Sequence, residues 1–141
     1  MNIQFAESDS AIRECFQAFS ELRPHLTEDA FVAQVKRQRQ NHGYTLVCIL
    51  NQGQVVAAAG YRVAEFLAWG KTFYLDDLIT VSTARKNGYG GTLMDWLLKE
   101  ARSRGCEQFH LDSGTHRHAA HRLYMSRKLQ ISSLHFSKDV E

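Results

Sequence analysis

The chain has few cysteines, no long apolar run and no leader-like N-terminus. Its three cysteines, Cys15, Cys48 and Cys106, lie far apart and form no Cys-x-x-Cys pair, which argues against a disulfide framework and against a thiolate zinc site. No apolar segment approaches the ~20 residues of a membrane-spanning helix, and the segment from Met1 to Phe5 lacks the basic-then-apolar plan of a secretory signal. We therefore expect a cytoplasmic protein with free thiols.

A strong charge of either sign is also lacking. The formal net charge is +2 at pH 7 and the sequence pI is about 8.5, which is too mild to indicate nucleic-acid binding. Hydrophobic residues make up 44% and charged residues 23% of the 141 positions, close to the average of soluble globular proteins, so disorder is not indicated. A chain of this length is about the size of one domain, and we expect residues 1–141 to form a single domain.

Apolar spacing in the first third of the chain predicts a short strand and two helices. Ile3 and Phe5 alternate with polar neighbours, as in a strand. Helical spacing then predicts one helix from about Ser10 to Leu22, which Pro24 ends. A second helix should run from a cap at Thr27 to Gly43.

The pattern then changes to that of a β-sheet. Residues 44–50, 55–66 and 72–81 should form three consecutive antiparallel strands, because only short connections separate them. After them we expect, in order, a helix that ends near Arg104, a strand at residues 106–113 parallel to the one before that helix, a helix at 118–127 and a final strand at 131–138.

A basic, glycine-rich turn, Arg85-Lys86-Asn87-Gly88-Tyr89-Gly90-Gly91, separates the third of these strands from the next helix. Its glycines can adopt positive φ and let a ligand approach the backbone. The following helix points its unpaired N–H groups and positive dipole end at the turn, and Arg85 and Lys86 add charges suited to a pyrophosphate. We interpret the turn as a phosphate-binding site; the alternative is a tight strand-to-helix turn without a ligand.

Two better-known phosphate motifs do not fit this spacing. A Walker loop requires Gly-Lys-Ser/Thr after its second glycine, whereas Gly90 is followed by Gly91 and Thr92. A dinucleotide fingerprint needs a small residue where this chain has Leu93, and it should follow the first strand of a βαβ unit rather than an antiparallel run. Neither nucleotide-binding class fits.

What fits is Arg85-x-x-Gly88-x-Gly90, which resembles the Q/R-x-x-G-x-G/A signature of the GNAT superfamily of acetyl-CoA-dependent acetyltransferases. The predicted order of elements is similar to that family's over essentially the whole chain, and Ala120-x-x-x-Tyr124 looks like its A-x-x-x-Y segment. The resemblance implies an α/β (α+β) GNAT fold: a mixed, mostly antiparallel central sheet of six to seven strands, flanked by four helices and splayed between its fourth and fifth strands.

The same resemblance implies the reaction and the donor site. The enzyme would move the acetyl group of acetyl-CoA directly to the amine of a small, aminoalkyl or amino-acid-like acceptor, with no metal, nucleic acid or membrane involved. A backbone N–H near Leu78 would stabilise the oxyanion, and Tyr124 would protonate or hydrogen-bond the CoA sulfur. The family's roles place the CoA phosphates at Arg85, Lys86, Asn87, Gly88, Tyr89, Gly90 and Gly91, and the pantetheine arm along Leu78, Ile79 and Thr80.

The general base is assigned from strand alternation. Alternation puts Tyr74, Asp76 and Leu78 on one face of the strand and Asp77 on the other, so Asp76 is better placed beside the thioester. Alternatively, the two aspartates form structural hydrogen bonds or bind the charge of the acceptor, and a chain of waters removes the proton. For Tyr124, the alternative role is the polar tip of an amphipathic helix.

The segment from Ser113 to Arg122 is rich in histidine and arginine and departs from the family pattern. Arg117 stands where many members carry asparagine, and Lys128 stands where they carry glycine. The basic run resembles that of the aminoalkylphosphonate acetyltransferase branch and could bind an anionic group; a solvated helix start is the other interpretation. The spacing His116-x-His118-x-x-His121 does not indicate a metal site, because 116 and 118 do not share a helix face and no carboxylate or thiolate joins them.

Other functions remain open at this level. The acceptor could be a protein amine, or the chain could be a CoA-binding regulatory module that has lost transfer, although Asp76 and Tyr124 argue against the latter. A generic anion or nucleic-acid binder would bind polynucleotide in a strongly salt-dependent way. The final strand at 131–138 would offer an edge for a homodimer.

Overall fold

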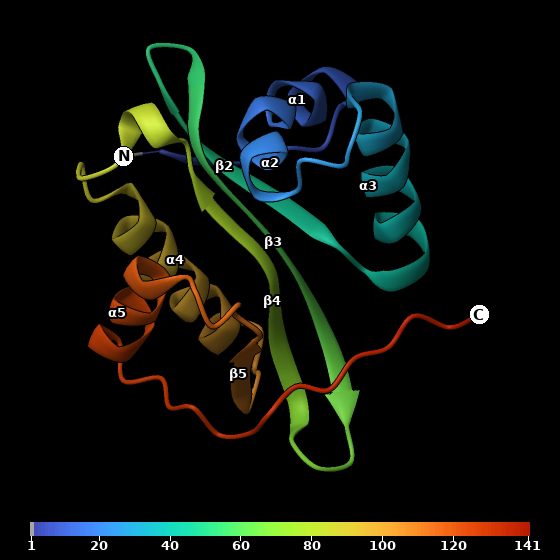
Figure 1. The fold of residues 1–141 in the computed structure, drawn as a ribbon, viewed down its shortest axis with the longest axis vertical. Helices are drawn as coiled ribbons and strands as arrows, with labels where there is room; N and C mark the ends of the chain where they lie inside the picture. The colour runs from blue at the N-terminus through green and yellow to red at the C-terminus, as the bar shows by residue number, and fades with distance from the viewer. Residues whose placement is uncertain (1) are drawn as a thin grey trace. The chain divides into compact units, whose positions relative to one another are not determined.

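The computed structural model describes residues 2–141, and the chain divides into two compact units, one ending at Leu111 and one spanning Asp112–Glu141. Figure 1 shows the elements. The first unit contains β1 (Ile3–Phe5), α1 (Asp9–Glu14), α2 (Phe16–Leu22), α3 (Glu28–His42), β2 (Thr45–Asn51), β3 (Gln54–Phe66), β4 (Gly70–Thr80), the 3₁₀ turn η1 (Ser82–Ala84), α4 (Tyr89–Ser103) and β5 (Gln108–Leu111), and the second contains α5 (His118–Ser126).

One sheet organises the first unit. Its strands follow the order β1-β2-β3-β4-β5; the first four pair antiparallel, and β5 pairs parallel to β4 after the α4 crossover. The three consecutive antiparallel strands and the parallel strand after the helix are thereby confirmed. Residues 2–141 form five strands in this sheet, so the expected six to seven was too many.

The expected last strand is the missing one. Residues 129–141 form no regular secondary structure, and Ile131, Leu134, Phe136 and Val140 are 79–99% exposed. A strand needs a second strand to satisfy its backbone donors and acceptors. The local sequence pattern predicted a strand at residues 131–138, but it could not show whether a second strand would pair with it.

The expected first helix is two helices that meet at Cys15. The Cys15 N–H donates to the Ile12 carbonyl, three residues back, at 3.0 Å, so the chain tightens by one 3₁₀-type turn before α2 begins. The apolar face continues through this break, which is why spacing alone predicted one helix. The described residues therefore form five α-helices rather than four.

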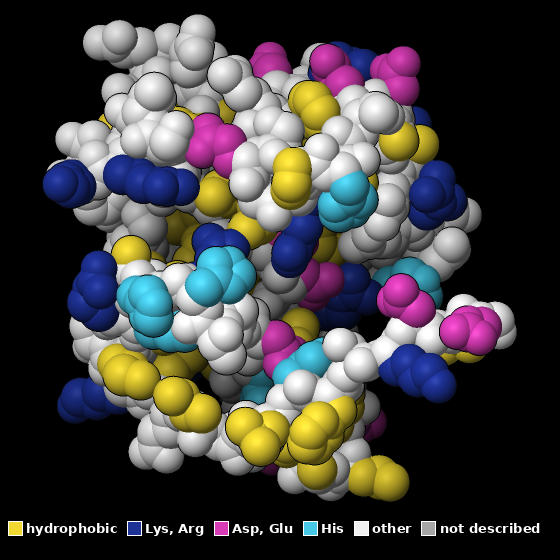
Figure 2. Space-filling view, in the orientation of Figure 1, with side chains coloured by type: hydrophobic (Ala, Val, Ile, Leu, Met, Phe, Trp, Pro, Cys, Tyr) yellow, Lys and Arg dark blue, Asp and Glu magenta, His cyan; other side chains and the backbone are white. Residues whose placement is uncertain are grey.

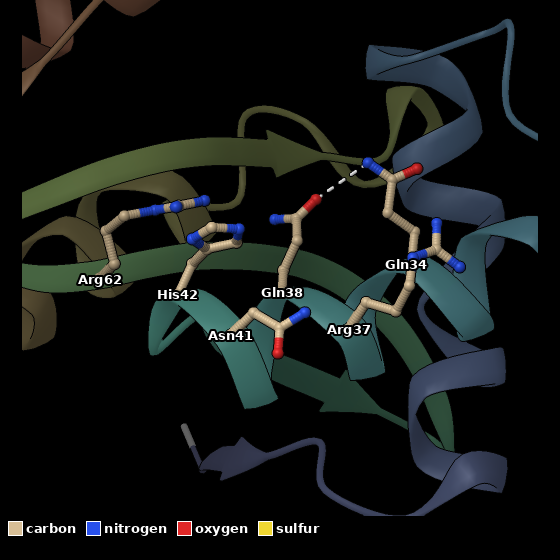
Figure 3. A pocket seen from close by; sticks show the side chains of 6 residues that line it. All are labelled: Gln34, Arg37, Gln38, Asn41, His42 and Arg62. Atoms are coloured by element: carbon tan, nitrogen blue, oxygen red, sulfur yellow. Dashed lines mark hydrogen bonds between the residues drawn. The ribbon is translucent and has the colours of Figure 1, made fainter.

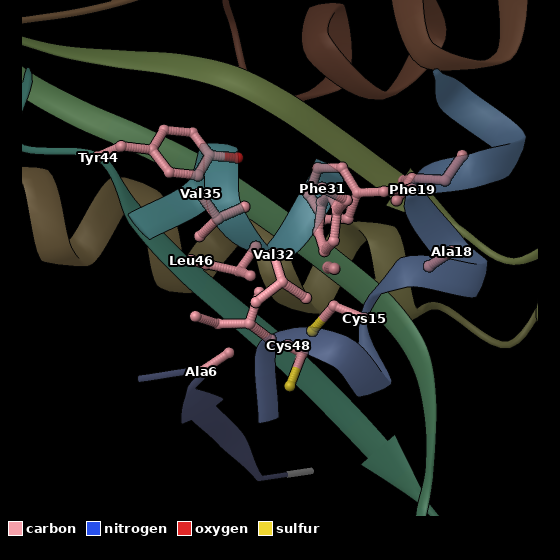
Figure 4. Packing of buried hydrophobic residues seen from close by; sticks show 13 residues of the cluster. Ala6, Cys15, Ala18, Phe19, Phe31, Val32, Val35, Tyr44, Leu46 and Cys48 are labelled. Carbon is pink, nitrogen blue, oxygen red and sulfur yellow. The ribbon is translucent and has the colours of Figure 1, made fainter. Parts of the chain in front are cut away.

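Strand alternation divides the core into two layers. On one face, Leu46, Cys48 and Ile79 pack among α1, α2 and α3 (Figure 4). On the other face, Tyr61 stacks on Phe73 with ring centroids 4.3 Å apart and contacts Trp96 of α4. The cysteines are free, as expected: Cys15 and Cys48 are buried and Cys106 is half-buried.

The sheet opens between β4 and β5. Their pairing runs from Thr72 with Gln108 to Leu75 with Leu111, whereas β4 continues to Thr80. Among the residues that the structure describes, the last part of β4 is therefore paired only with β3. This is the splay expected between the fourth and fifth strands.

Candidate active site

The glycine turn ends in an open helix N-terminus. Lys86 and Gly88 have φ of 69° and 79°, and Gly88 is the N-cap of α4 without a side-chain cap. Thr92 N–H donates to the Gly88 carbonyl at 3.0 Å, which closes the first α-helical turn. The N–H groups of residues 89–91 precede that turn and point out of the 15-residue helix. They form a set of donors with the positive end of the helix dipole behind them, which suits a phosphate.

Hydrogen bonds hold the turn in shape. Asn87 Nδ2 donates to the Ala84 carbonyl at 2.9 Å, and Arg85 Nε donates to the Thr80 carbonyl at 3.4 Å. The Ser82 N–H donates to Glu21 Oε1 at 3.0 Å. Arg85, Lys86 and Asn87 are exposed, so these charges and donors can reach a bound anion. The residues present thus fit the pyrophosphate expected from the sequence.

The strand that leads into the turn has an open edge. Leu78, Ile79 and Thr80 pair with Ala59, Ala58 and Ala57 of β3. On the side away from β3 the partner strand β5 has already ended. The Ile79 side chain is buried in the core, while residues 78 and 80 are half-buried. This backbone edge can pair with an extended, amide-containing ligand such as a pantetheine arm.

A β-bulge changes the expected faces of the two aspartates. Leu75 pairs with Tyr61 and Asp77 pairs with Gly60, which leaves Asp76 as the extra residue. Asp76 accepts from Nε and Nη2 of Arg62. The prediction that alternation separates Asp76 from Asp77 was therefore wrong, because the bulge interrupts alternation where it was applied.

Asp77 lies in the same polar cluster as Asp76. It accepts from Tyr44 Oη at 2.8 Å and from Arg23 Nη2 at 2.9 Å, and the Arg62 guanidinium lies over the Tyr44 ring, 5.8 Å from its centroid. Burial raises the pKa of Asp76, and Arg62 opposes that rise. Burial and the neighbouring Asp77 carboxylate raise the pKa of Tyr44 well above its usual value. The cluster couples two carboxylates to two guanidinium groups and one phenol.

The partners of the aspartates carried no sequence motif. Arg23, Tyr44 and Arg62 come from the end of α2, the start of β2 and the middle of β3. One signal was present: Arg62 is a charged residue inside the apolar run of β3. A charge in a half-buried strand generally needs a partner, and that argument could have paired Arg62 with an aspartate across the sheet.

Tyr124 belongs to the second unit, on α5. Burial raises its pKa above the usual value, and Arg117 lowers it. In the same unit, His121 Nε2 lies 2.9 Å from the Gly114 carbonyl oxygen. Lys128 has φ of 67° and follows the end of α5, so it adopts the left-handed conformation that glycine usually supplies at this position of the family.

No group of three or more histidine, cysteine, aspartate or glutamate side chains within residues 2–141 is arranged to hold a metal ion. In the same residues, no helix is both long and apolar enough to cross a membrane. On the face seen in Figure 2, Lys and Arg side chains lie at several separate places.

The chain belongs to the acetyltransferase (GNAT) family, whose model matches residues 9–128. Its class is therefore that of the N-acetyltransferases, and the fold is one that binds acetyl-CoA. The Arg85-x-x-Gly88-x-Gly90 motif, the predicted order of elements and the Ala120-x-x-x-Tyr124 segment predicted this class from the sequence.

Among curated proteins, the chain is 29% identical over 128 residues to the uncharacterized N-acetyltransferase YhdJ of Bacillus subtilis (strain 168). This match covers 90% of each of the two chains. A putative acetyltransferase from Agrobacterium tumefaciens str. C58 has the same fold, with a TM-score of 0.84, 21% identity and coverage of 99% of this chain and 100% of that one. An aminoglycoside N-acetyltransferase solved in complex with CoA matches with a TM-score of 0.82, 11% identity and coverage of 98% and 95%.

Proposed function

We propose that this protein transfers the acetyl group of acetyl-CoA directly to the amine of a small-molecule acceptor. The observation that carries the proposal is the open N-terminus of α4 behind Gly88, reached along the unpaired edge of β4. In this proposal the turn from Arg85 to Gly91 binds the CoA phosphates, and residues Leu78, Ile79 and Thr80 pair with the pantetheine arm.

The chemistry assigns one role to each candidate residue. An ammonium acceptor first gives a proton to Asp76, directly or through a water, and the neutral amine nitrogen then attacks the thioester carbonyl carbon. A backbone N–H near Leu78 donates to the oxyanion. The carbon–sulfur bond breaks as the amide forms, and Tyr124 gives its proton to the departing thiolate. The nitrogen loses its second proton as it becomes an amide, and that proton returns to Tyr124 directly or through water.

The contacts of Asp76 are compatible with a base. The Arg62 guanidinium keeps a carboxylate ionised, and an ionised carboxylate can accept a proton. Burial acts in the other direction and raises the pKa of Asp76, which brings the carboxyl closer to the proton affinity that a base needs near neutral pH. An ordinary tyrosine has a pKa of about 10 and is protonated at neutral pH, and burial raises the pKa of Tyr124 further.

Two alternatives use the same donor site. A protein amine could be the acceptor, and a regulatory module would bind acetyl-CoA without transfer. A pocket between α3 and β3, lined by Gln38, His42 and Arg62 among others, supports a small acceptor over a protein amine. The presence of both Asp76 and Tyr124 supports an active enzyme over a silent one.

We also propose that the two units together form one acetyltransferase domain and that the enzyme is a cytoplasmic homodimer. The family match from residue 9 to residue 128 spans both units, and the free cysteines suit a reducing compartment. Ile131, Leu134 and Phe136 expose apolar side chains on the C-terminal tail, and a second copy of the chain is the occupant that we propose for them.

A thermal-shift experiment tests the donor site directly. Acetyl-CoA should raise the melting temperature, because a ligand that binds only the folded state stabilises it. A polynucleotide should not raise it at 150 mM salt. A rise with polynucleotide that disappears with salt, together with no response to acetyl-CoA, would instead indicate a general anion binder.

A further inference from the structure

A pocket of about 500 Å³ lies between the second half of α3 and the middle of β3. Figure 3 shows the five α3 side chains and Arg62, which comes from the strand. None of its lining side chains carries a carboxylate, and all can donate hydrogen bonds or carry positive charge. They are Gln34, Arg37, Gln38, Asn41, His42 and Arg62.

The α3 side of the pocket is ordered by a hydrogen bond between two glutamines. Gln34 Nε2 donates to Gln38 Oε1 at 2.9 Å. Because its oxygen is engaged, Gln38 turns its amide nitrogen away from Gln34 and toward His42, as Figure 3 shows. The pocket therefore receives the donor end of this amide.

Arg37 differs from the neighbouring cations of α3. Lys36 pairs with Asp9 at 3.1 Å, and Arg39 donates to the Glu7 carbonyl at 2.9 Å. Among residues 2–141, no carboxylate is paired with Arg37, although it lines the pocket. An arginine without a carboxylate partner, at the Gln34 end of a pocket lined by donors (Figure 3), favours an anionic ligand.

Arg62 links this pocket to the polar cluster of β4. Asp76 engages its Nε and Nη2 atoms, and the Tyr44 ring lies beneath the guanidinium. The Arg62 guanidinium is thus held by the Asp76 carboxylate at its edge and by the Tyr44 ring against its face. Its end points toward His42 in Figure 3, so the Nη1 side is presented to the pocket.

We propose that the α3 pocket binds an oxyanion carried by the acceptor, so that the acceptor is an amine with a carboxylate, phosphate or phosphonate group. The inference rests on the proposed acetyl transfer and names the acceptor class for it. Gln38 and Arg62 hold the oxyanion, and Arg37, at the Gln34 end of the pocket (Figure 3), adds positive charge. Asp76, on the far side of Arg62, receives the proton of the ammonium group. One arginine therefore contacts both the anion site and the candidate base.

Matched acceptors test the acceptor class. 2-Aminoethylphosphonate, β-alanine and propylamine are similar in length and differ in the charge of the group opposite the amine. We expect kcat/KM for at least one of the two anionic amines to exceed that for propylamine by about tenfold or more, since a site built for polar contacts rejects an analogue that lacks them. The larger value identifies a phosphonate-type or a carboxylate group.

Two variants of α3 localise the effect. Arg37→Gln should reduce the preference for anionic over neutral amines about tenfold, mainly through KM for the acceptor. Lys36→Gln, which removes a neighbouring charge of the same helix outside the pocket, should keep the preference. Equal values of kcat/KM for all three amines, or a preference unchanged in Arg37→Gln, would overturn the proposal.

A binding measurement separates this inference from the proposed transfer. With CoA present at saturation to block the phosphate turn, inorganic phosphate should raise the melting temperature of the wild type and of Lys36→Gln but not of Arg37→Gln. If no amine is acetylated and phosphate still shows this pattern, the transfer proposal fails and the anion pocket stands. If amines are acetylated and phosphate acts equally on all three proteins, the pocket proposal fails and the transfer stands.

Discussion

Lys86 combines a positive charge with a backbone conformation that glycine adopts more easily. Its φ is 69°, and a non-glycine residue in the left-handed region is destabilised by about 1–2 kcal/mol. A glycine would relieve this strain at no loss of shape. That the chain has lysine there is consistent with a role for its charge beside the helix N-terminus.

Two substitutions separate the charge of Lys86 from its strain. Lys86→Gly should raise the free energy of unfolding by about 1 kcal/mol, whereas Lys86→Gln should leave it nearly unchanged. Both should weaken acetyl-CoA binding several-fold, because both remove the phosphate-facing charge. Melting curves with and without acetyl-CoA measure the two effects; unchanged affinity in both variants would remove Lys86 from the donor site.

Asp76 and Asp77 are distinguished by a pair of asparagine variants. If Asp76 is the base, Asp76→Asn should lower kcat/KM by about 10²–10⁴-fold. Asp77→Asn should have a much smaller effect, since the Asp76–Arg62 pair remains. A larger loss in Asp77→Asn than in Asp76→Asn would reverse the assignment.

The pH dependence follows from the same pKa shift. Burial raises the pKa of Asp76 above the ordinary aspartate value, so its basic form is gained as pH rises through this higher pKa. The acid limb of kcat/KM in the wild type should therefore lie above the ordinary pKa of about 3.9. That limb should disappear in Asp76→Asn, and a limb that stays at the same pH would assign it to another group.

The sequence predicted local residue chemistry better than long-range partners. Arg85 and Gly88 could be singled out because the turn motif is contiguous. The structure confirms the positive φ of Gly88, and their contact with CoA stays a prediction. The contacts of Asp76 could not be predicted in this way. Its partner Arg62 is 14 positions away in the sequence, and the bulge at Asp76 depends on how β3 and β4 align. A bulge caused by one extra residue therefore cannot be predicted from the local sequence pattern.

At the scale of elements, Gly60 of β3 lies against the Tyr44 ring, next to the bulge in the pairing of β3 with β4. A Cβ atom at this position would lie 1.7 Å from Tyr44 Oη and 2.1 Å from its Cζ. The Tyr44 ring is buried and its hydroxyl donates to Asp77, so it cannot move aside easily. Gly60 therefore makes room for the phenol that holds one of the two aspartates.

Gly60→Ala should lower the free energy of unfolding by about 1–3 kcal/mol, as for overpacked core positions. The melting temperature should fall by several degrees, roughly 2–10 °C. A second variant, Gly60→Ala with Tyr44→Ala, removes the clashing ring and should lose less than the sum of the two single changes. Additive losses would show that the methyl group does not meet Tyr44.

Strong periodicity made most elements predictable. The apolar, β-rich runs of β2 to β4, separated by short turns, and the helical spacing of α4 predicted their type and nearly their ends, because each pattern extends over many residues. The short break at Cys15 leaves the apolar face of the helix intact, so the spacing of apolar residues could not predict it. The prediction of a final strand was wrong for another reason. A strand needs a partner strand, and that pairing is not encoded in the local pattern.

At the scale of the whole molecule, the C-terminal tail is the feature that a monomer leaves unexplained. Leu134 and Phe136 are 79% and 88% exposed, and exposed apolar groups of this kind mark an interaction surface. Light scattering after size exclusion should give twice the chain mass of 16.1 kDa.

Variants of the tail give that measurement a control. Phe136→Asp should shift the protein toward the monomer mass, because it puts a charge where the proposed dimer would bury an apolar side chain. Ser133→Asp adds the same charge to the tail without removing an apolar group and should remain dimeric. A wild type with the monomer mass at micromolar concentration would contradict the proposed homodimer.

The central claim is direct transfer from acetyl-CoA to an amine, with Tyr124 as the proton donor. Its most direct test is the release of CoA thiol, measured with an anionic amine for the wild type and for Tyr124→Phe. We expect amine-dependent thiol release with one acetylated amine per thiol, and a kcat lower by about 10²–10³-fold in the variant, which should still be stabilised by acetyl-CoA. Thiol release that does not depend on any amine would contradict the transfer, and an unchanged kcat in Tyr124→Phe would contradict the role of the tyrosine.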